Sequence, residues 1–240
     1  MTTFCKKILP LGCALVLAGC AGATVSQEST SAPVTNARPQ QIVVYPFATN
    51  PSEVTLNQGP LQRVFRNVSG ANADAEQSKI ADETAEDVCQ QVAAALNQKG
   101  YSALCQKRGV PAGTGNILVI DGQFTKIDEG NTARRLVIGF GAGAASLDTS
   151  VYVVQPAPDG GQRQILSFDT HADSGKMPGA AVTGPVGAAG GASAGVAAGA
   201  SVAMGGAKTY SSSMGYLGGK TADQIVQSLV NYFAAQGWAS

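Results

Sequence analysis

Few side chains in this sequence could take part in covalent or acid–base chemistry, and the sulfur atoms are the most informative of them. The chain has five cysteines and a single histidine. Cys20 stands directly after the small residues Ala18 and Gly19, and these follow a start with two lysines and an apolar run at residues 8–16. That layout is typical of a secretory signal. The small residues Ala18 and Gly19 would fit the cleft of a peptidase that removes the signal. Cleavage after Gly19 would leave Cys20 as the first residue, with a nucleophilic sulfur that can be modified.

The four residues Leu17-Ala18-Gly19-Cys20 resemble the lipobox of bacterial lipoproteins. In that family a lipid is joined to the cysteine thiol and the chain is cut just before it. The resemblance therefore implies that residues 1–19 are a signal peptide and that Cys20 carries the lipid, with several acyl chains giving firm anchoring. The next residue is Ala21 rather than the aspartate that tends to retain such proteins at the inner membrane. We expect an outer-membrane lipoprotein of the cell envelope that faces the periplasm.

The two cysteines outside the signal and the lipobox are expected to form a disulfide. Cys89 and Cys105 are the thiols that remain in an oxidising compartment. A helix from Cys89 to Gly100 rises about 16 Å, and a returning strand from Gly100 to Cys105 covers about the same distance, so the two sulfurs are level. The bond would close a loop of about 15 residues. Two independent buried cysteines are the alternative.

His171 is the one imidazole base in the chain. It lies two residues from Asp169 and two from Asp173, so on a strand all three would point to one face. A metal site needs three or four ligands, and the chain offers no second cluster. A nucleophilic triad would have only His171 as its base, and no G-x-S-x-G elbow is present. We expect no catalytic, metal or cofactor residue; an envelope hydrolase or metal-dependent enzyme built on His171 is the alternative.

Charge and length limit the function classes further. The 240 residues include 16 basic and 16 acidic side chains, and charged residues make up 13% of the chain. Removal of a signal that contains Lys6 and Lys7 leaves a net charge of −2. Without a basic stripe, nucleic-acid binding has no electrostatic support. The length allows one domain, or one domain with an appendage.

Hydrophobic periodicity predicts an α/β domain at residues 41–175. Apolar residues recur every four positions through residues 76–98, which predicts a helix closed by Lys99-Gly100. Residues 221–236 predict a second helix, with a capping box that starts at Thr221. Alternating or β-branched runs predict strands at residues 42–47, 101–106, 117–127, 147–154 and 163–171, the last two as a hairpin. The predicted fold class is α/β, a mixed sheet packed by two helices.

Two further segments are predicted outside the strands and helices, one before them and one inserted among them. Residues 20–40 are rich in Ser, Thr, Ala and Pro, which is typical of a flexible tether between lipid and domain. A Gly/Ala-rich segment at residues 176–219 is inserted before the C-terminal helix of residues 220–240, and it has no charge between Lys176 and Lys208.

Glycine recurs in that segment at every fourth residue, at positions Gly187, Gly191, Gly195 and Gly199. A spacing of four puts successive glycines on nearly one helical face, where another backbone can fit. Each glycine costs a helix roughly 1 kcal/mol relative to alanine, so an isolated helix in water would not hold. We expect a glycine-zipper helix, or pair of helices, for self-association or membrane contact; a flexible linker is the alternative.

The run of residues 129–143 resembles a family of bacterial envelope lipoproteins with a domain of unknown function, number 4410. The motif residues are Arg134, Arg135, Gly139, Gly141 and Gly143, and the resemblance covers roughly residues 42–171. These glycines lack the spacing of a phosphate loop, and we interpret them as a bend that lets two backbones approach. That family has no established activity.

More loosely, the order of a strand, a helix and two strands is similar to the amino-terminal domain of the Tol-system propeller protein and to the curli-secretion lipoprotein. These similarities imply an α/β sandwich that works by binding and assembly. We therefore expect a lipid-anchored envelope protein that is not an enzyme and acts as a docking, assembly or self-associating module. Its expected partners are the membrane, through the lipid, and an envelope protein or a second copy; no nucleic acid is expected.

Overall fold

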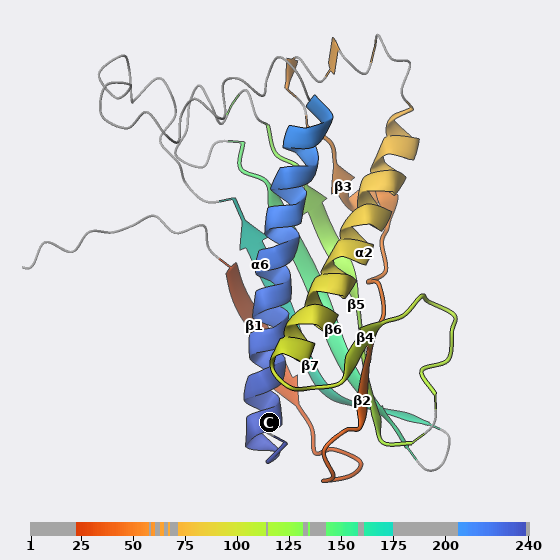
Figure 1. Cartoon of the computed structure of the whole chain (residues 1–240). Helices are drawn as coiled ribbons and strands as arrows, with labels where there is room; N and C mark the ends of the chain where they lie inside the picture. Colours follow the sequence, from red (N-terminus) through yellow and green to blue (C-terminus); the bar gives the residue numbers. More distant parts are fainter. Residues whose placement is uncertain are drawn as a thin grey trace, which may run out of the picture.

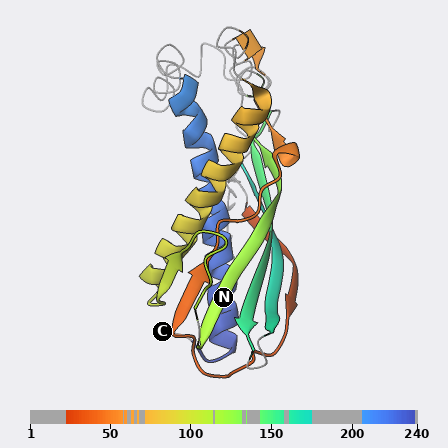
Figure 2. The same cartoon turned by 90° about the vertical axis from the view of Figure 1, so that its right-hand side faces the viewer.

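A computed structural model describes residues 23–57, 59–60, 63–64, 67, 72–113, 115–131, 134, 143–157, 161–174 and 206–238. These residues form two layers, a mixed seven-stranded sheet and two long helices that lie side by side on one of its faces (Figure 1 and Figure 2). The helices are α2 (Ala73–Gln98) and α6 (Gly206–Ala235). The predicted α/β class, with a mixed sheet packed by two helices, is confirmed.

The sheet has the order β1-β7-β6-β5-β2-β4, and β3 pairs with β5 beyond the end of β2. Its strands are β1 (Ala23–Thr30), β2 (Gln41–Val44), β3 (Val54–Thr55), β4 (Ala103–Cys105), β5 (Ile117–Asp128), β6 (Ser146–Pro156) and β7 (Gln162–Asp173), with a short 3-10 helix, η1 (Pro51–Glu53), before β3. The strands from β1 to β5 along this order are antiparallel neighbours, whereas β2 and β4 run parallel to β5. The predicted hairpin is the β6–β7 pair.

Helix α2 ends where Lys99-Gly100 predicts and begins earlier than predicted. The side chain of Asn72 caps the first turn by accepting a hydrogen bond from the backbone N–H of Asp74. At the other end Gly100 adopts φ 81°, and Tyr101 N–H donates to the carbonyl of Leu96. The helix is the one predicted at residues 76–98, with three further residues at its start.

Helix α6 is longer than the predicted helix of residues 221–236, because glycines in its first half face α2. A Cβ on Gly218 would lie 3.4 Å from Cγ2 of Val88, and a Cβ on Gly219 would lie 3.0 Å from Oε1 of Gln91. Small residues therefore let the two helices approach closely. Thr221 is fully buried in the middle of the helix, so the predicted capping box is wrong. Among the described residues, no helix combines the length and apolar character needed to cross a bilayer.

Residues after position 22 differ from the flexible tether that we predicted. Ala23–Thr30 form β1, an edge strand paired with β7. The segment that follows is held by the C-terminal aromatic residues: Tyr232 Oη donates to the carbonyl of Ser31 at 3.0 Å, and Trp238 Nε1 donates to that of Asn36 at 2.8 Å. Burial raises the pKa of Tyr232, so its hydroxyl stays a donor. Ser- and Thr-rich composition fits an exposed edge strand as well as a linker.

The sheet has one face under the helices and one face without a helix among the described residues. Along β6, Leu147, Val151 and Val153 are buried in the core, whereas the alternate residues Asp148 and Tyr152 are half-buried on the other face. The core therefore lies between the sheet and the two helices. The polar face brings His171 next to Asp148 of the neighbouring strand β6 and to Asp173 of its own strand.

Candidate functional site

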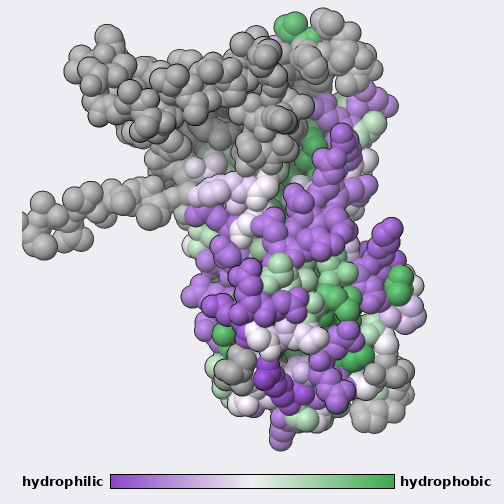
Figure 3. All heavy atoms as spheres, viewed as in Figure 1, coloured by the Kyte–Doolittle hydropathy of each residue, from purple (hydrophilic) through white to green (hydrophobic). Residues whose placement is uncertain are grey.

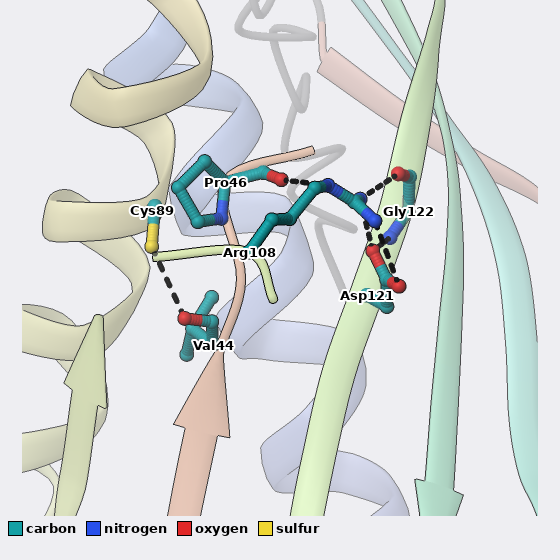
Figure 4. Close-up of polar contacts among 6 residues, drawn as sticks. All are labelled: Val44, Pro46, Cys89, Arg108, Asp121 and Gly122. Carbon is teal, nitrogen blue, oxygen red and sulfur yellow. Dashed lines mark hydrogen bonds and ion pairs between the residues drawn. The ribbon is translucent and has the colours of Figure 1, made fainter. Parts of the chain in front are cut away.

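The disulfide predicted between Cys89 and Cys105 is present and joins α2 to β4, with Cα atoms 5.5 Å apart. Cys89 is fully buried, and its sulfur lies 3.3 Å from the carbonyl oxygen of Val44 (Figure 4). A disulfide sulfur carries no hydrogen, so this is a packing contact. The bond fixes α2 against the edge strand β4, beside the end of its neighbour β2.

Strand β2 is the point at which the strand order reverses. The chain passes from β2 through α2 to β4 on one side, and β5 then lies on the other side of β2. In open α/β sheets, ligands bind outside the carboxyl ends of the strands at such a point. Here a groove of about 460 Å³ lies between the segment after β2, the face of α2 and the loop after β4; its lining includes Phe47, Asp82, Glu86 and Arg108. This groove is the candidate site.

Arg108 forms one wall of the groove, and each of its three guanidinium nitrogens donates a hydrogen bond (Figure 4). Its Nε donates to the carbonyl of Pro46 at 2.9 Å, and its Nη2 donates to that of Gly122 at 3.1 Å. Nη1 donates to Oδ2 of Asp121 at 3.3 Å, and Nη2 contacts the other carboxylate oxygen. These bonds neutralise the guanidinium and tie the loop after β4 to β5 and to the chain after β2.

Gly122 lets the floor of the groove pack against the sheet. A Cβ at this position would lie 2.6 Å from the carbonyl oxygen of Ser150 and 3.2 Å from ring carbons of Phe47. Phe47 is almost fully buried and stacks at a tilt on Phe124, with ring centroids 5.8 Å apart. The absent side chain therefore makes room for an apolar floor.

Two carboxylates carry the remaining charge of the groove lining. Asp82 and Glu86 are both exposed and stand one turn apart on α2. Glu86 accepts a hydrogen bond from Gln90 Nε2 at 2.8 Å. Like charges four residues apart destabilise a helix slightly, and a bound cation would relieve that repulsion. The groove thus suits a positively charged group that also makes apolar contact.

His171 lies on the polar face of the sheet, away from this groove. Its Nδ1 contacts the carboxylate of Asp148 on β6, and its Nε2 lies 3.6 Å from Oδ2 of Asp173. Asp169, which we expected beside it, instead accepts a hydrogen bond from Ser150 Oγ at 2.7 Å. Spacing along one strand could not reveal Asp148, because it comes from the neighbouring strand. No group of three or more His, Cys, Asp or Glu side chains in the described part of the chain is placed to hold a metal ion.

The family motif is only partly described, and its described end makes a close backbone approach. Gly130 and Gly143 adopt φ values of 69° and 77°, and a Cβ on Gly130 would lie 2.4 Å from the carbonyl oxygen of Gly143. That oxygen accepts a hydrogen bond from Asn131 N–H at 2.9 Å. Gly143 thus takes part in the predicted approach of two backbones. Arg134 is exposed.

A family model described as "Domain of unknown function (DUF4410)" matches residues 42–191, more than half of the chain. The chain belongs to this family. The DUF4410 match begins at β2, spans the groove and the disulfide, and continues past β7 to include Gly187 and Gly191. No curated protein matches the chain. The description of the family names no activity.

Several predicted site residues lie outside the described residues: the lipid-attachment residue Cys20, the motif residues Arg135, Gly139 and Gly141, and the repeat glycines Gly187, Gly191, Gly195 and Gly199. The groove itself was not predicted. One signal was present in the sequence, because a β-branched strand that ends at Pro46 and is followed by a helical crossover marks a parallel strand with a free carboxyl end.

Proposed function

We propose that this DUF4410 protein is a lipid-anchored docking module of the cell envelope, which binds a protein partner through the groove beside α2. The observation that carries the proposal is the Cys89–Cys105 disulfide. Structural disulfides persist in oxidising compartments and are rare in the cytosol, so the bond supports export. The motif Leu17-Ala18-Gly19-Cys20 supports a lipid anchor, with the domain at the periplasmic side of the outer membrane.

The lipid anchor is tested by metabolic labelling with an acyl-chain analogue. The wild type should take up the label and Cys20→Ala should not, because Cys20 supplies the acylated sulfur. Cys105→Ala is the matched control: it removes a different cysteine and should keep the label. Equal labelling of the wild type and Cys20→Ala would refute the anchor.

The docking partner is expected to offer a lysine or arginine side chain to the groove. Asp82 and Glu86 supply charge complementarity, and the buried Phe47 and its neighbours supply apolar contact below them. Arg108 is bound to Asp121 and does not compete for these carboxylates. Partner binding through such a groove needs no reacting group, so the docking role does not depend on His171.

Crosslinking in intact cells, followed by identification of the co-purified protein, tests the docking role. The double variant Asp82→Asn, Glu86→Gln should lose the crosslinked partner. Glu83→Gln is the control, because Glu83 lies on the same helix but forms a surface ion pair with Lys79 at 3.7 Å. A partner retained equally by both variants would contradict docking at the groove.

The enzymatic alternative depends on His171. A docking module should complement a deletion strain with His171→Ala, since this side chain lies on the other face of the sheet from the helices, beside the carboxylates of Asp148 and Asp173. Loss of complementation by a variant that still forms the disulfide would favour the enzyme.

A further inference from the structure

We infer that one flank of the domain, formed by β1 and by α6 at Tyr216 and Lys220, lies against the phospholipid surface of the membrane. This flank is called the anchor flank below. The inference rests on the lipid at Cys20 proposed above and adds an orientation to it. It places the groove beside α2 on the opposite flank, where a periplasmic partner can reach it.

The lipid-attachment residue is close to a strand that cannot move away from the domain. β1 pairs with β7 from its first residue, with Ala23 opposite Ala172 and Thr24 opposite His171. Only three residue steps separate Cys20 from Ala23, and three steps span at most about 11 Å. The start of β1 is therefore held within about that distance of the membrane surface whenever Cys20 is acylated.

Tyr216 lies level with the start of β1. Tyr232 binds the carbonyl of Ser31, just past the end of β1, and α6 packs along β1 in the same direction (Figure 1). The 16 residues back from Tyr232 to Tyr216 rise about 24 Å along a helix. β1 has a bulge between Ser26 and Ser29, so the chain from Ser31 back to Ala23 covers about 23 Å. The two lengths are similar, so Tyr216 lies near the level at which the chain leaves β1 toward the lipid.

Tyr216 and Lys220 point away from the rest of the helical layer. An α-helix turns about 100° per residue, so both residues lie about 160° around α6 from Gly218, which contacts α2. Tyr216 is 55% exposed, and Lys220 Nζ lies 5.3 Å from the centre of its ring. An exposed tyrosine with a lysine over its face is a pair typical of membrane–water interfaces, where the ring sits at headgroup depth and the amine reaches phosphate.

The face over the helices favours a small contact with the membrane surface over insertion of a whole face into the bilayer. Viewed over the helices, the described surface is mainly hydrophilic with scattered hydrophobic patches (Figure 3). Acyl chains therefore supply the affinity, and the anchor flank sets the orientation. In the sheet, β1 and β2 stand four strand steps apart, or about 19 Å, which separates the groove from the membrane.

Photocrosslinking in cells tests the orientation with the full-length, lipid-modified protein. A benzophenone amino acid replaces Tyr216 in one variant and Val110 in another, in cells whose phospholipids carry an alkyne label. Val110 is the matched control, because it is 49% exposed but lies in the loop after β4, at the other edge of the sheet. Several-fold more lipid label at position 216 than at position 110 is expected.

Equal lipid label at positions 216 and 110, or no lipid label at position 216, would overturn the inferred orientation. If Cys20 still carries the acyl label in that experiment, the proposed lipid anchor remains supported. A crosslink from 216 to protein instead of lipid would also overturn it. Absence of acyl label on Cys20 would overturn both. A second pair, Tyr216→Trp and Val110→Trp, gives an independent measurement: brominated phospholipid should quench only the first, above a common background from the buried Trp238.

Discussion

Arg108 and Asp121 meet side chain to side chain, and this pair ties the loop after β4 to the middle of β5. The same guanidinium donates to the carbonyls of Pro46 and Gly122, so one side chain links three separate segments around the candidate groove. The wall of the groove thus depends on a single residue.

Arg108→Ala should lower the free energy of unfolding by about 1–2 kcal/mol. The ion pair is partly exposed and contributes at most about 1 kcal/mol, and the lost bonds to two carbonyls contribute a similar amount. Denaturant unfolding measures the change. Arg163→Ala, an exposed residue on β7, should stay within about 0.5 kcal/mol of wild type. Equal effects of the two substitutions would show that Arg108 does not tie the segments together.

Removal of the disulfide should destabilise the domain by roughly 3 kcal/mol in the chain-entropy model, because the bond closes a loop of about 15 residues. The double variant Cys89→Ala, Cys105→Ala tests this in denaturant, beside wild type with and without reductant. Reduced wild type should resemble the variant. Free-thiol counting on unfolded, non-reduced protein checks the bond itself, and two reactive thiols from this pair would refute it.

Two glycine substitutions should change stability in opposite directions. Gly122→Ala should cost about 1–3 kcal/mol, because its Cβ would lie 2.6 Å from a backbone oxygen that cannot easily move. Gly215→Ala should add roughly 0.5–1 kcal/mol, since it lies within α6 and no heavy atom beyond its own surroundings lies within 4 Å of the new Cβ. Thermal unfolding of both variants decides the point; a shift in the same direction would contradict the packing described at Gly122.

The repeat glycines outside the described residues stay a prediction. Gly191→Leu with Gly195→Leu should abolish any oligomer and any detergent-resistant membrane association, because bulk on that helical face blocks close approach. The domain should stay folded. Ala189→Leu with Ser193→Leu is the control, two residues earlier and about 160° around a helix. Unchanged assembly and extraction in the glycine variant would mean that the segment is a linker.

Local patterns were enough to predict much of the fold. Four-residue apolar spacing and an end at Gly100 located α2, and β-branched or alternating runs located β5, β6 and β7. The rise per residue of a helix and of a strand predicted that Cys89 and Cys105 would meet, because both residues lie close to the reversal of chain direction at Gly100. Each of these inferences depends on neighbours within about 20 residues.

What the tertiary structure decided involves partners that are distant in the sequence. Ser- and Thr-rich residues became the edge strand β1 because β7 offered a free edge and α6 placed Tyr232 at Ser31. Glycines that look like helix breakers became part of the first half of α6, where α2 lies against Gly218. The groove exists because crossover connections bring Phe47, Glu86 and Arg108 together at the end of β2. Composition and periodicity specify what a segment can form, and packing between distant segments selects which form it takes.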